Sequence, residues 1–158
     1  TAELFASEAS VPMVHVPYAG FPQVTSAILG EQIEAAFMAP SGAIAQAKAG
    51  KVRILGVTSP VPSSVAPGVP TIADVARLPG FNAELWLGAY APRSMPAGVA
   101  ERLSAEIAAA LKSPEARSKL ESQGWEPVGA NPDVMRRRMA TDLKTWGGVI
   151  ERLQIKLE

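Results

Sequence analysis

The sequence predicts an α/β fold, with a parallel-type sheet in its first part and a group of helices in its second. Between residues 11 and 58, three short apolar runs rich in β-branched residues alternate with two short helical segments. The connections between them are only a few residues long, which favours parallel strands joined by crossover helices. From residue 95 onward, apolar residues recur every three or four positions, which is the period of a helix.

Local signals give the predicted elements of the first part. Pro17 lies near the end of a run that reads as a buried strand. Gly30 and Gly50 end two short helices, and Ser41 is a plausible N-cap for the second of them. The predicted order is a helix at 1–9, a strand at 11–18, a helix at 24–30, a strand at 33–38, a helix at 43–49 and a strand at 52–58.

The second part begins after a proline-rich loop at 59–72 and a short helix near 74–76. An extended segment, Asn82–Ala91, is followed by an amphipathic helix from Met95 to Leu111 and by another that Pro114 opens. Asn131 caps a final helix. Its predicted inner face consists of Met135, Met139, Leu143, Trp146 and Ile150.

Composition excludes several classes of protein. The chain has 158 residues, enough for one domain or a little more, and 47% of them are hydrophobic. Fifteen Lys and Arg balance fifteen Asp and Glu, so charge gives no reason to expect nucleic acid as a partner. Cysteine is absent, which excludes disulfides and thiolate chemistry. The first residues do not have the pattern of a signal peptide, which fits either a cytoplasmic protein or one whose signal was removed.

The sequence offers little for catalysis. His15 is the only histidine, and on a buried strand it is more often a packed residue than a base. The chain has no Gly-X-Ser-X-Gly elbow and no HExxH motif. We therefore predict no catalytic residue, no metal site and no cofactor. The run Arg136–Arg138 is interpreted as a solvated helix face.

The loops after the first two predicted strands are better candidates for a site. Ligands of parallel α/β sheets bind beyond the carboxyl ends of the strands. Each loop leads into a helix, whose first N–H groups form a carboxylate or phosphate site without a charged side chain. Ordinary βα turns explain the same pattern equally well. The candidate ligand-binding residues are Tyr18, Ala19, Gly20, Phe21 and Pro22 in the first loop, Met38, Ala39, Pro40 and Ser41 in the second, and Trp86, which could line a cleft.

Several motifs in the same order resemble those of one family. They are HVPYAG, LGEQIEAAF, AKAGKVRILGVTS, GVPTIADV, LPGF, the W-x-G-x-x-AP segment around Trp86, and the tail from PEARSKLESQGWEPVGANPD to KTWGGVI. Together they cover nearly the whole chain. The sequence is similar to the tripartite tricarboxylate transporter receptors, the Bug-type periplasmic solute-binding proteins.

This resemblance implies a periplasmic binding protein of the type II flytrap class, not an enzyme. Such a receptor captures a small organic acid, often a carboxylate, between two lobes and delivers it to membrane transporter subunits. Residues 10–85 would form the second, ligand-binding lobe. Residues 86–158 would form a crossing segment and C-terminal helices that pack on the first lobe. The family's ligand loops correspond to Tyr18–Pro22 and Met38–Ser41.

The chain departs from the family pattern in three places. The family's first lobe precedes this point and is largely missing, so we expect a truncated gene product, a proteolytic fragment or a deliberately shortened chain. Ala19 stands where the family often has Lys. Met38 and Ala39 replace a common polar pair, which favours an aromatic or otherwise less polar acid over citrate. With the first lobe absent, the apolar faces of the C-terminal helices would be partly bare, so we expect a homo-oligomer or an exchange of elements.

Two other functions remain open at this level. One is an α/β hydrolase-like enzyme that uses Ser41 or Tyr18, which would need a carboxylate or His15 close by. The other is an interaction module that binds no small ligand.

Overall fold

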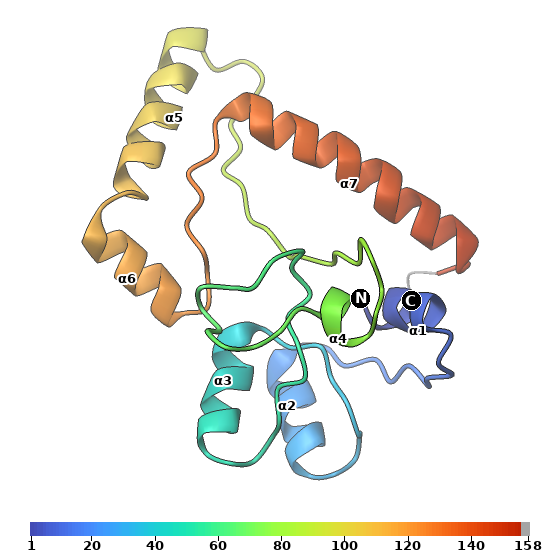
Figure 1. Cartoon of the computed structure of the whole chain (residues 1–158). Helices are drawn as coiled ribbons and strands as arrows, with labels where there is room; N and C mark the ends of the chain where they lie inside the picture. The colour runs from blue at the N-terminus through green and yellow to red at the C-terminus, as the bar shows by residue number, and fades with distance from the viewer. Residues whose placement is uncertain (156–158) are drawn as a thin grey trace. The chain divides into compact units, whose positions relative to one another are not determined.

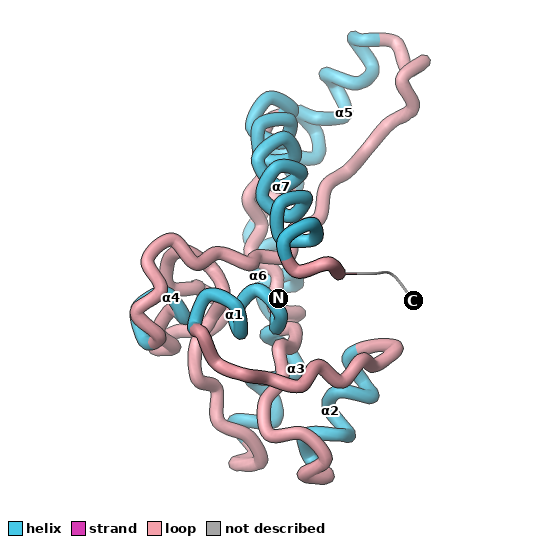
Figure 2. Tube along the Cα trace, turned by 90° about the vertical axis from the view of Figure 1, so that its right-hand side faces the viewer, coloured by secondary structure: helices cyan, strands magenta, loops and turns pink. Residues whose placement is uncertain are grey.

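The computed structural model describes residues 1–155, which fold as two compact units. The first unit contains Thr1–Leu85 and Leu120–Glu126, and the second contains Trp86–Lys119 and the chain from Pro127 onward. These described residues consist of helices and loops and contain no β-strand (Figures 1 and 2). The helices are α1 Ala2–Ala9, α2 Phe21–Leu29, α3 Pro40–Lys48, α4 Ile72–Val75, α5 Ala97–Ala110, α6 Pro114–Ser122 and α7 Pro132–Arg152.

The helices form close to where their local signals predict them. Asn131 caps α7 as predicted, because its side chain accepts a hydrogen bond of 2.9 Å from the N–H of Val134. Thr71 caps the short α4 in the same way, through the N–H of Asp74. Within residues 1–155, no helix combines the length and the apolar character that crossing a bilayer requires.

Two helices begin earlier than the sequence analysis predicts. α2 begins at Phe21 and α3 at Pro40, each three residues before the predicted start. In both, proline lies in the first turn, where its fixed φ suits a helix and its missing N–H costs no hydrogen bond. The prediction that Ser41 caps α3 is wrong, since Ala39 is the N-cap residue and Ser41 lies inside the first turn.

The three predicted strands are extended segments without a hydrogen-bonded ladder. Residues 11–17 are exposed, with Val14 at 91%, so the prediction that this segment is buried is wrong. Two prolines there also remove ladder donors. The described residues contain one isolated parallel bridge, between Val57 and Thr71, where the N–H of Ile72 donates to the carbonyl of Val57 at 2.8 Å. The parallel sheet therefore stays a prediction.

The core of the first unit gathers around Phe81. This ring is 2% exposed and meets the ring of Phe5 edge-on at 6.0 Å. Phe5 in turn contacts Phe37, also at 6.0 Å. Thr58 fixes the chain beside this cluster, because its hydroxyl donates to the carbonyl of Ala83 at 3.2 Å. The other buried apolar residues of this unit are Leu4, Ala27, Ala66, Ile72 and Ala83.

The second unit contains the extended segment at 86–96, α5, the first part of α6, and α7. Met135, Met139 and Trp146 are half-buried, as expected for the inner face of α7. Leu143 is 74% exposed and Ile150 is also exposed, so the predicted face is only partly covered. An apolar side chain on a helix is buried only where another element packs against it. The period of the sequence does not show how far along the helix that packing extends.

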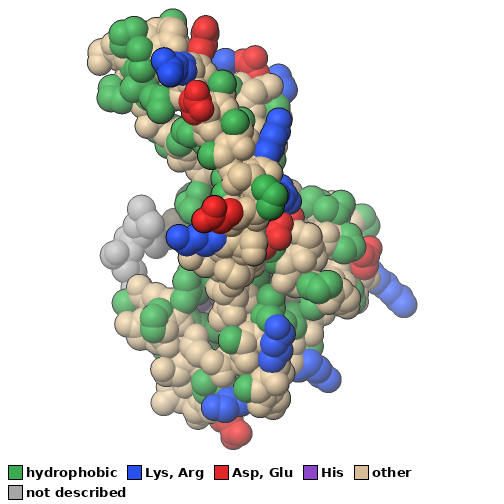
Figure 3. All heavy atoms as spheres, turned by 90° about the vertical axis from the view of Figure 1, so that its left-hand side faces the viewer, with side chains coloured by type: hydrophobic (Ala, Val, Ile, Leu, Met, Phe, Trp, Pro, Cys, Tyr) green, Lys and Arg blue, Asp and Glu red, His purple; other side chains and the backbone are tan. Residues whose placement is uncertain are grey.

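Charge is distributed evenly over the surface that Figure 3 presents. Basic and acidic side chains are interspersed there, and neither sign forms a large patch. This agrees with the balance of fifteen basic and fifteen acidic residues. On this face, the described residues form no continuous basic surface of the kind that binds nucleic acid.

Candidate functional site

The first candidate loop leads into the N-terminus of α2. Gly20 is the N-cap residue in an extended conformation, and its carbonyl accepts the first helical bond, from the N–H of Val24 at 3.3 Å. The N–H groups of Phe21 and Gln23 precede that bond, so they have no partner within the helix. Phe21, Pro22 and Gln23 are exposed. This end of the helix is accessible to a ligand.

The second candidate loop leads into α3 in the same manner. Ala39 caps the helix, and its carbonyl accepts from the N–H of Ala43 at 3.2 Å. The N–H groups of Ser41 and Gly42 therefore lie in the unpaired first turn. Residues 38–42 are half-buried, so this helix end is less open than that of α2.

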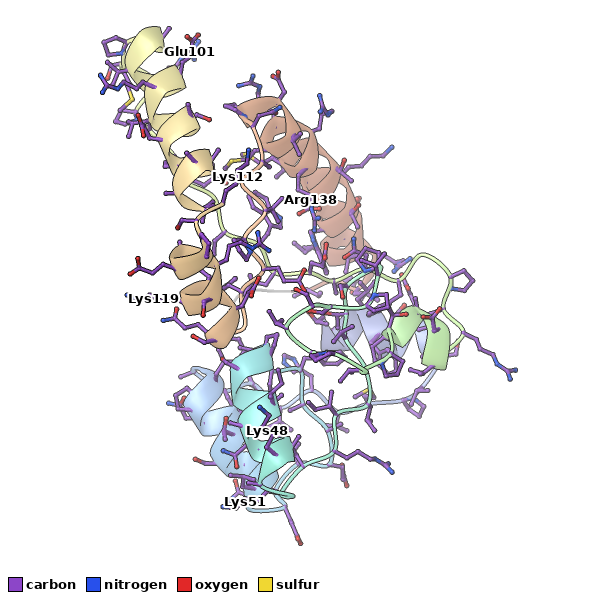
Figure 4. The ribbon with its side chains drawn as sticks, turned by 60° about the vertical axis from the view of Figure 1, so that its left-hand side comes forward. Lys48, Lys51, Glu101, Lys112, Lys119 and Arg138 are labelled. Atoms are coloured by element: carbon purple, nitrogen blue, oxygen red, sulfur yellow. The ribbon has the colours of Figure 1, made fainter. Side chains whose placement is uncertain are left out.

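The two helix ends lie at the same end of a pair. α2 and α3 run side by side in the first unit, with their first turns at the same end (Figures 1 and 4). Lys48 and Lys51 lie at the opposite end of α3 (Figure 4). Each N-terminus carries a partial positive charge of about half an elementary charge. The pair therefore offers backbone donors and a favourable field for an anion without a lysine or arginine.

A hollow of about 440 Å³ opens beside α2. Two predicted site residues, Tyr18 and Pro22, line it. The sequence analysis missed the others, although the α2 residues among them share one face at the helical spacing of three and four. All of the lining residues are uncharged, so the hollow can donate and accept hydrogen bonds but supplies no ion pair. The missed residues are Gln23, Ser26, Ala27 and Gln32.

The remaining predicted site residues lie outside this hollow. Ala19, Gly20 and Phe21 belong to the α2 loop, and Met38–Ser41 belong to the α3 loop. Trp86 belongs to the second unit. The structure thus brings the two loops to one end of a helix pair. Trp86 instead makes a hydrogen bond to Asp142 of α7.

A turn from far along the sequence packs against the start of α3. Gly124 has φ +83° and follows the end of α6. A Cβ at this position would lie 2.8 Å from the backbone nitrogen of Ser41 and 3.3 Å from the Cβ of Pro40. Only glycine therefore fits without moving the backbone of α3. A glycine after a helix is common, so the local sequence does not distinguish this one.

Glu126 ties the same turn to the proline-rich loop. One of its carboxylate oxygens accepts hydrogen bonds from the hydroxyl of Ser63 and, at 2.8 Å, from the N–H of Ser64. The hydrogen bond from Ser63 is the main reason that the pKa of Glu126 is held below its ordinary value of 4.5. Burial opposes this shift, and the backbone donors around Ser64 add to it. No sequence motif identifies this contact, which spans about 60 residues.

These hydrogen bonds predict how stability changes with pH. The folded-state pKa of Glu126 is lowered, so its contribution to stability is complete above the unfolded value near 4.5 and disappears as pH falls through the folded value. Glu126→Gln lacks this titration. We expect the difference in thermal midpoint between the wild type and Glu126→Gln to be largest near neutral pH and to shrink toward pH 3.5. A difference that stays constant over this range would contradict the assignment.

No catalytic constellation forms around the candidate nucleophiles. His15 is not packed as predicted, because its side chain is 57% exposed and Nδ1 lies 3.7 Å from a carboxylate oxygen of Glu3. Between residues 1 and 155, neither an imidazole nor a carboxylate makes a hydrogen bond to Ser41 or Tyr18. The same part of the chain contains no cluster of three His, Cys, Asp or Glu side chains suited to a metal ion.

Trp86 holds α7 in the second unit. Its indole N–H donates to a carboxylate oxygen of Asp142 at 2.5 Å, and Nε of Arg138 donates to both oxygens of that carboxylate at 3.1 Å. Burial opposes ionisation of Asp142, but the hydrogen bonds from Trp86 and Arg138 and the charge of Arg138 together lower its pKa. Trp86 thus has a packing role here, and its role toward a ligand stays a prediction.

Trp86→Phe keeps an aromatic ring but removes the donor to Asp142. A hydrogen bond to a charged group contributes about 1.5–3 kcal/mol. Arg138 still pairs with the carboxylate, so we expect a loss of about 1–2 kcal/mol in the free energy of unfolding. Denaturation with guanidinium, followed by circular dichroism, measures it. In a double-mutant cycle with Asp142→Ala, which removes the acceptor, the two losses should not add, and simple additivity would show that the bond contributes nothing.

The described chain matches one family along its whole length. Residues 1–155 match the model of the tripartite tricarboxylate transporter family receptors. A curated relative from Pseudomonas sp. strain P51, the UPF0065 protein in the tcbD-tcbE intergenic region, is 34% identical over 147 residues, which make up 93% of this chain and 44% of that protein.

Solved structures resemble the chain closely. R. palustris Rpa4515 with adipate superposes with a TM-score of 0.82 at 28% identity, covering 98% of this chain and 51% of that one. The periplasmic binding protein BugD superposes with a TM-score of 0.74 at 21% identity, covering 99% of this chain and 53% of that one, and supports the fold alone. The chain thus spans about half the length of these relatives.

Proposed function

The chain belongs to the tripartite tricarboxylate transporter family of receptors, and on that premise we propose that it contributes the ligand-binding part of a receptor for a small organic acid. The observation that carries this proposal is the pair of helix N-termini at Phe21 and Pro40, which lie at the same end of α2 and α3. Each supplies backbone N–H groups to a carboxylate. The hollow beside α2 supplies neutral hydrogen-bonding groups for the rest of the ligand.

A dicarboxylate such as adipate is the first ligand to test. Rpa4515 was solved with adipate, and this chain superposes on it with a TM-score of 0.82. The neutral lining of the hollow suits the methylene chain of such an acid better than it suits a third carboxylate. The half-buried Met38 and Ala39 strengthen this preference for a less polar, or an aromatic, acid over citrate.

Exchanging Met38 and Ala39 for Asp and Asn tests this preference. We expect the double variant to bind adipate or benzoate about tenfold more weakly, because a half-buried carboxylate repels the ligand and costs desolvation. Titration calorimetry with adipate, benzoate and citrate measures the change. A variant that keeps the order of ligand preference of the wild type would rule out a role for these two residues in specificity.

The finer architecture is also part of the proposal. Residues 10–85 form the ligand-binding lobe of a type II flytrap fold, and the extended segments at 11–18, 33–38 and 52–58 belong to its parallel sheet. The side-by-side arrangement of α2 and α3 and the parallel bridge between Val57 and Thr71 support this assignment. The segments from residue 86 onward supply the crossing segment and the helices that pack on the other lobe.

The receptor acts in the periplasm and passes its ligand to membrane transporter subunits, as membership of the family suggests. Apolar side chains on α5 and α7 are exposed, notably Val99, Leu103 and Leu143. They support association of this chain with another copy through its C-terminal helices. Light scattering tests the association, and a clean monomer at all concentrations would exclude it.

The alternative functions have less support. A hydrolase would need a base beside Ser41 or Tyr18, and His15 contacts Glu3 instead. An interaction module without a ligand is the reading in which the paired helix ends are ordinary turns, and membership of the receptor family favours a ligand site instead. Turnover of simple esters would favour the first alternative, and a complete lack of ligand binding would favour the second.

Thermal unfolding in the presence of organic acids tests the proposal. A ligand that binds only the folded state stabilises it by about 2.7 kcal/mol at a hundred times its dissociation constant. We expect adipate or another carboxylate to raise the midpoint, and adipamide, which has the same carbon chain without charge, to have no effect. Equal shifts with both compounds, or no shift with any acid, would contradict a carboxylate site.

A further inference from the structure

The start of α3 is held in place by a segment that lies far from it in sequence. Leu120–Glu126 belongs to the first unit, although the chain before it and after it belongs to the second. Within this segment, the N–H groups of Gln123 and Trp125 donate to the carbonyl of Leu120 at 2.9 and 3.0 Å. The segment therefore consists of the end of α6 and a tight turn closed by its own hydrogen bonds.

Two contacts join this turn to other parts of the first unit. Gly124 packs against the backbone of Ser41, where a Cβ would come within 2.8 Å of the nitrogen. Two residues later, Glu126 accepts hydrogen bonds from the side chain of Ser63 and the backbone of Ser64. If the second contact is removed, the turn loses the carboxylate that joins it to the proline-rich loop, while its packing against α3 remains.

We infer that Glu126 is a positioning residue for the organic-acid site, which it serves by holding Gly124 against the first turn of α3. This inference rests on the proposed function, because it concerns the donors of Ser41 and Gly42. With the turn in place, one side of this helix end is shielded from water, and a donor in a shielded site binds an anion more strongly. Glu126 itself does not touch the ligand, since its carboxylate binds Ser63 and Ser64.

The charge of Glu126 is directed toward the proline-rich loop. Two hydrogen bonds are directed at one oxygen of Glu126 and spread its negative charge over donors of the proline-rich loop. Glutamine at this position keeps an acceptor oxygen of the same reach. The conservative variant should therefore keep the turn in place, whereas alanine should not.

Glu126→Ala tests the inference with Glu101→Ala as the matched control. Glu101 is an exposed glutamate on α5 (Figure 4). We expect Glu126→Ala to weaken adipate binding about tenfold in calorimetry. This is the effect of losing one charge-assisted hydrogen bond between the start of α3 and the ligand. Glu126→Gln should recover most of the affinity, and Glu101→Ala should change it less than twofold. Glu126→Ala that is less stable but binds adipate with wild-type affinity would overturn the inference.

A measurement without ligand separates this inference from the proposed function. We expect the amide resonances of Ser41 and Gly42 to shift in Glu126→Ala and to stay in place in Glu101→Ala. Unchanged resonances in both variants would overturn the inference even if the wild type binds adipate. A wild type that binds no organic acid would instead overturn the proposed function, while the resonances still decide whether Glu126 positions the start of α3.

Discussion

Phe21→Pro should weaken carboxylate binding about ten- to a hundredfold, although it leaves α2 intact. Proline removes only the backbone N–H at the first helical position, which has no partner inside the helix. It is also the residue that this position prefers, and the extended Gly20 before it suits a proline. A hydrogen bond from this N–H to a carboxylate is worth about 1.5–3 kcal/mol, and about 1.4 kcal/mol is a factor of ten. Titration calorimetry with adipate measures the loss.

Phe21→Ala is the matched control for this substitution. It removes the same ring, which is 50% exposed, but keeps the N–H group. We expect it to bind adipate within about threefold of the wild type, since an exposed ring contributes little. If both variants lose affinity equally, the ring binds the ligand and the backbone N–H does not.

Phe81→Ala should reduce the free energy of unfolding by about 3–5 kcal/mol, the usual cost of removing a buried aromatic ring. Phe81 is 2% exposed and packs edge-on against Phe5. Its loss leaves a cavity in a core that contains few other large side chains. Guanidinium denaturation monitored by circular dichroism gives the change.

The same substitution at Phe21 provides the comparison, because Phe21→Ala should cost less than about 0.5 kcal/mol. Phe81→Leu serves as a milder variant if Phe81→Ala does not fold, with an expected loss between those of the two alanine variants. A loss of under about 1 kcal/mol in Phe81→Ala would show that the core does not depend on this ring.

The helices could be predicted because their signals are local. Asn131 and Pro114 mark the starts of α7 and α6 in the sequence as they do in the structure. α2 and α3 begin three residues before their predicted starts, because a proline near each start opens the helix. A proline can end one element or begin the next. Which of the two it does depends on the conformation of the residues before it.

The extended segments show the limit of such reasoning. Apolar, β-branched residues at 11–18 indicate a strand, but a strand is completed only by neighbours that pair with it. In this structure Val14 is 91% exposed, and no pairing joins residues 11–18 to the segments at 33–38 and 52–58. Pairing is a property of distant segments, which a local pattern does not specify.

The candidate site divides in the same way. The two loops before α2 and α3 could be found from sequence, because each follows an apolar run and precedes a helix. Gly124 and Glu126 could not be found, because their partners lie about 60 to 80 residues away. Gln32, which lines the hollow, could not be found either. It follows the turn after α2, so it lies outside the helical period that relates the other lining residues.

The most direct test of the central claim is an amide-resonance titration of the whole chain with adipate. If paired helix ends bind the acid, the largest changes will fall on Phe21, Gln23, Ser41 and Gly42, and adipamide will not reproduce them. Changes confined to residues beyond 86, or equal changes with adipamide, would contradict a carboxylate site at the starts of α2 and α3.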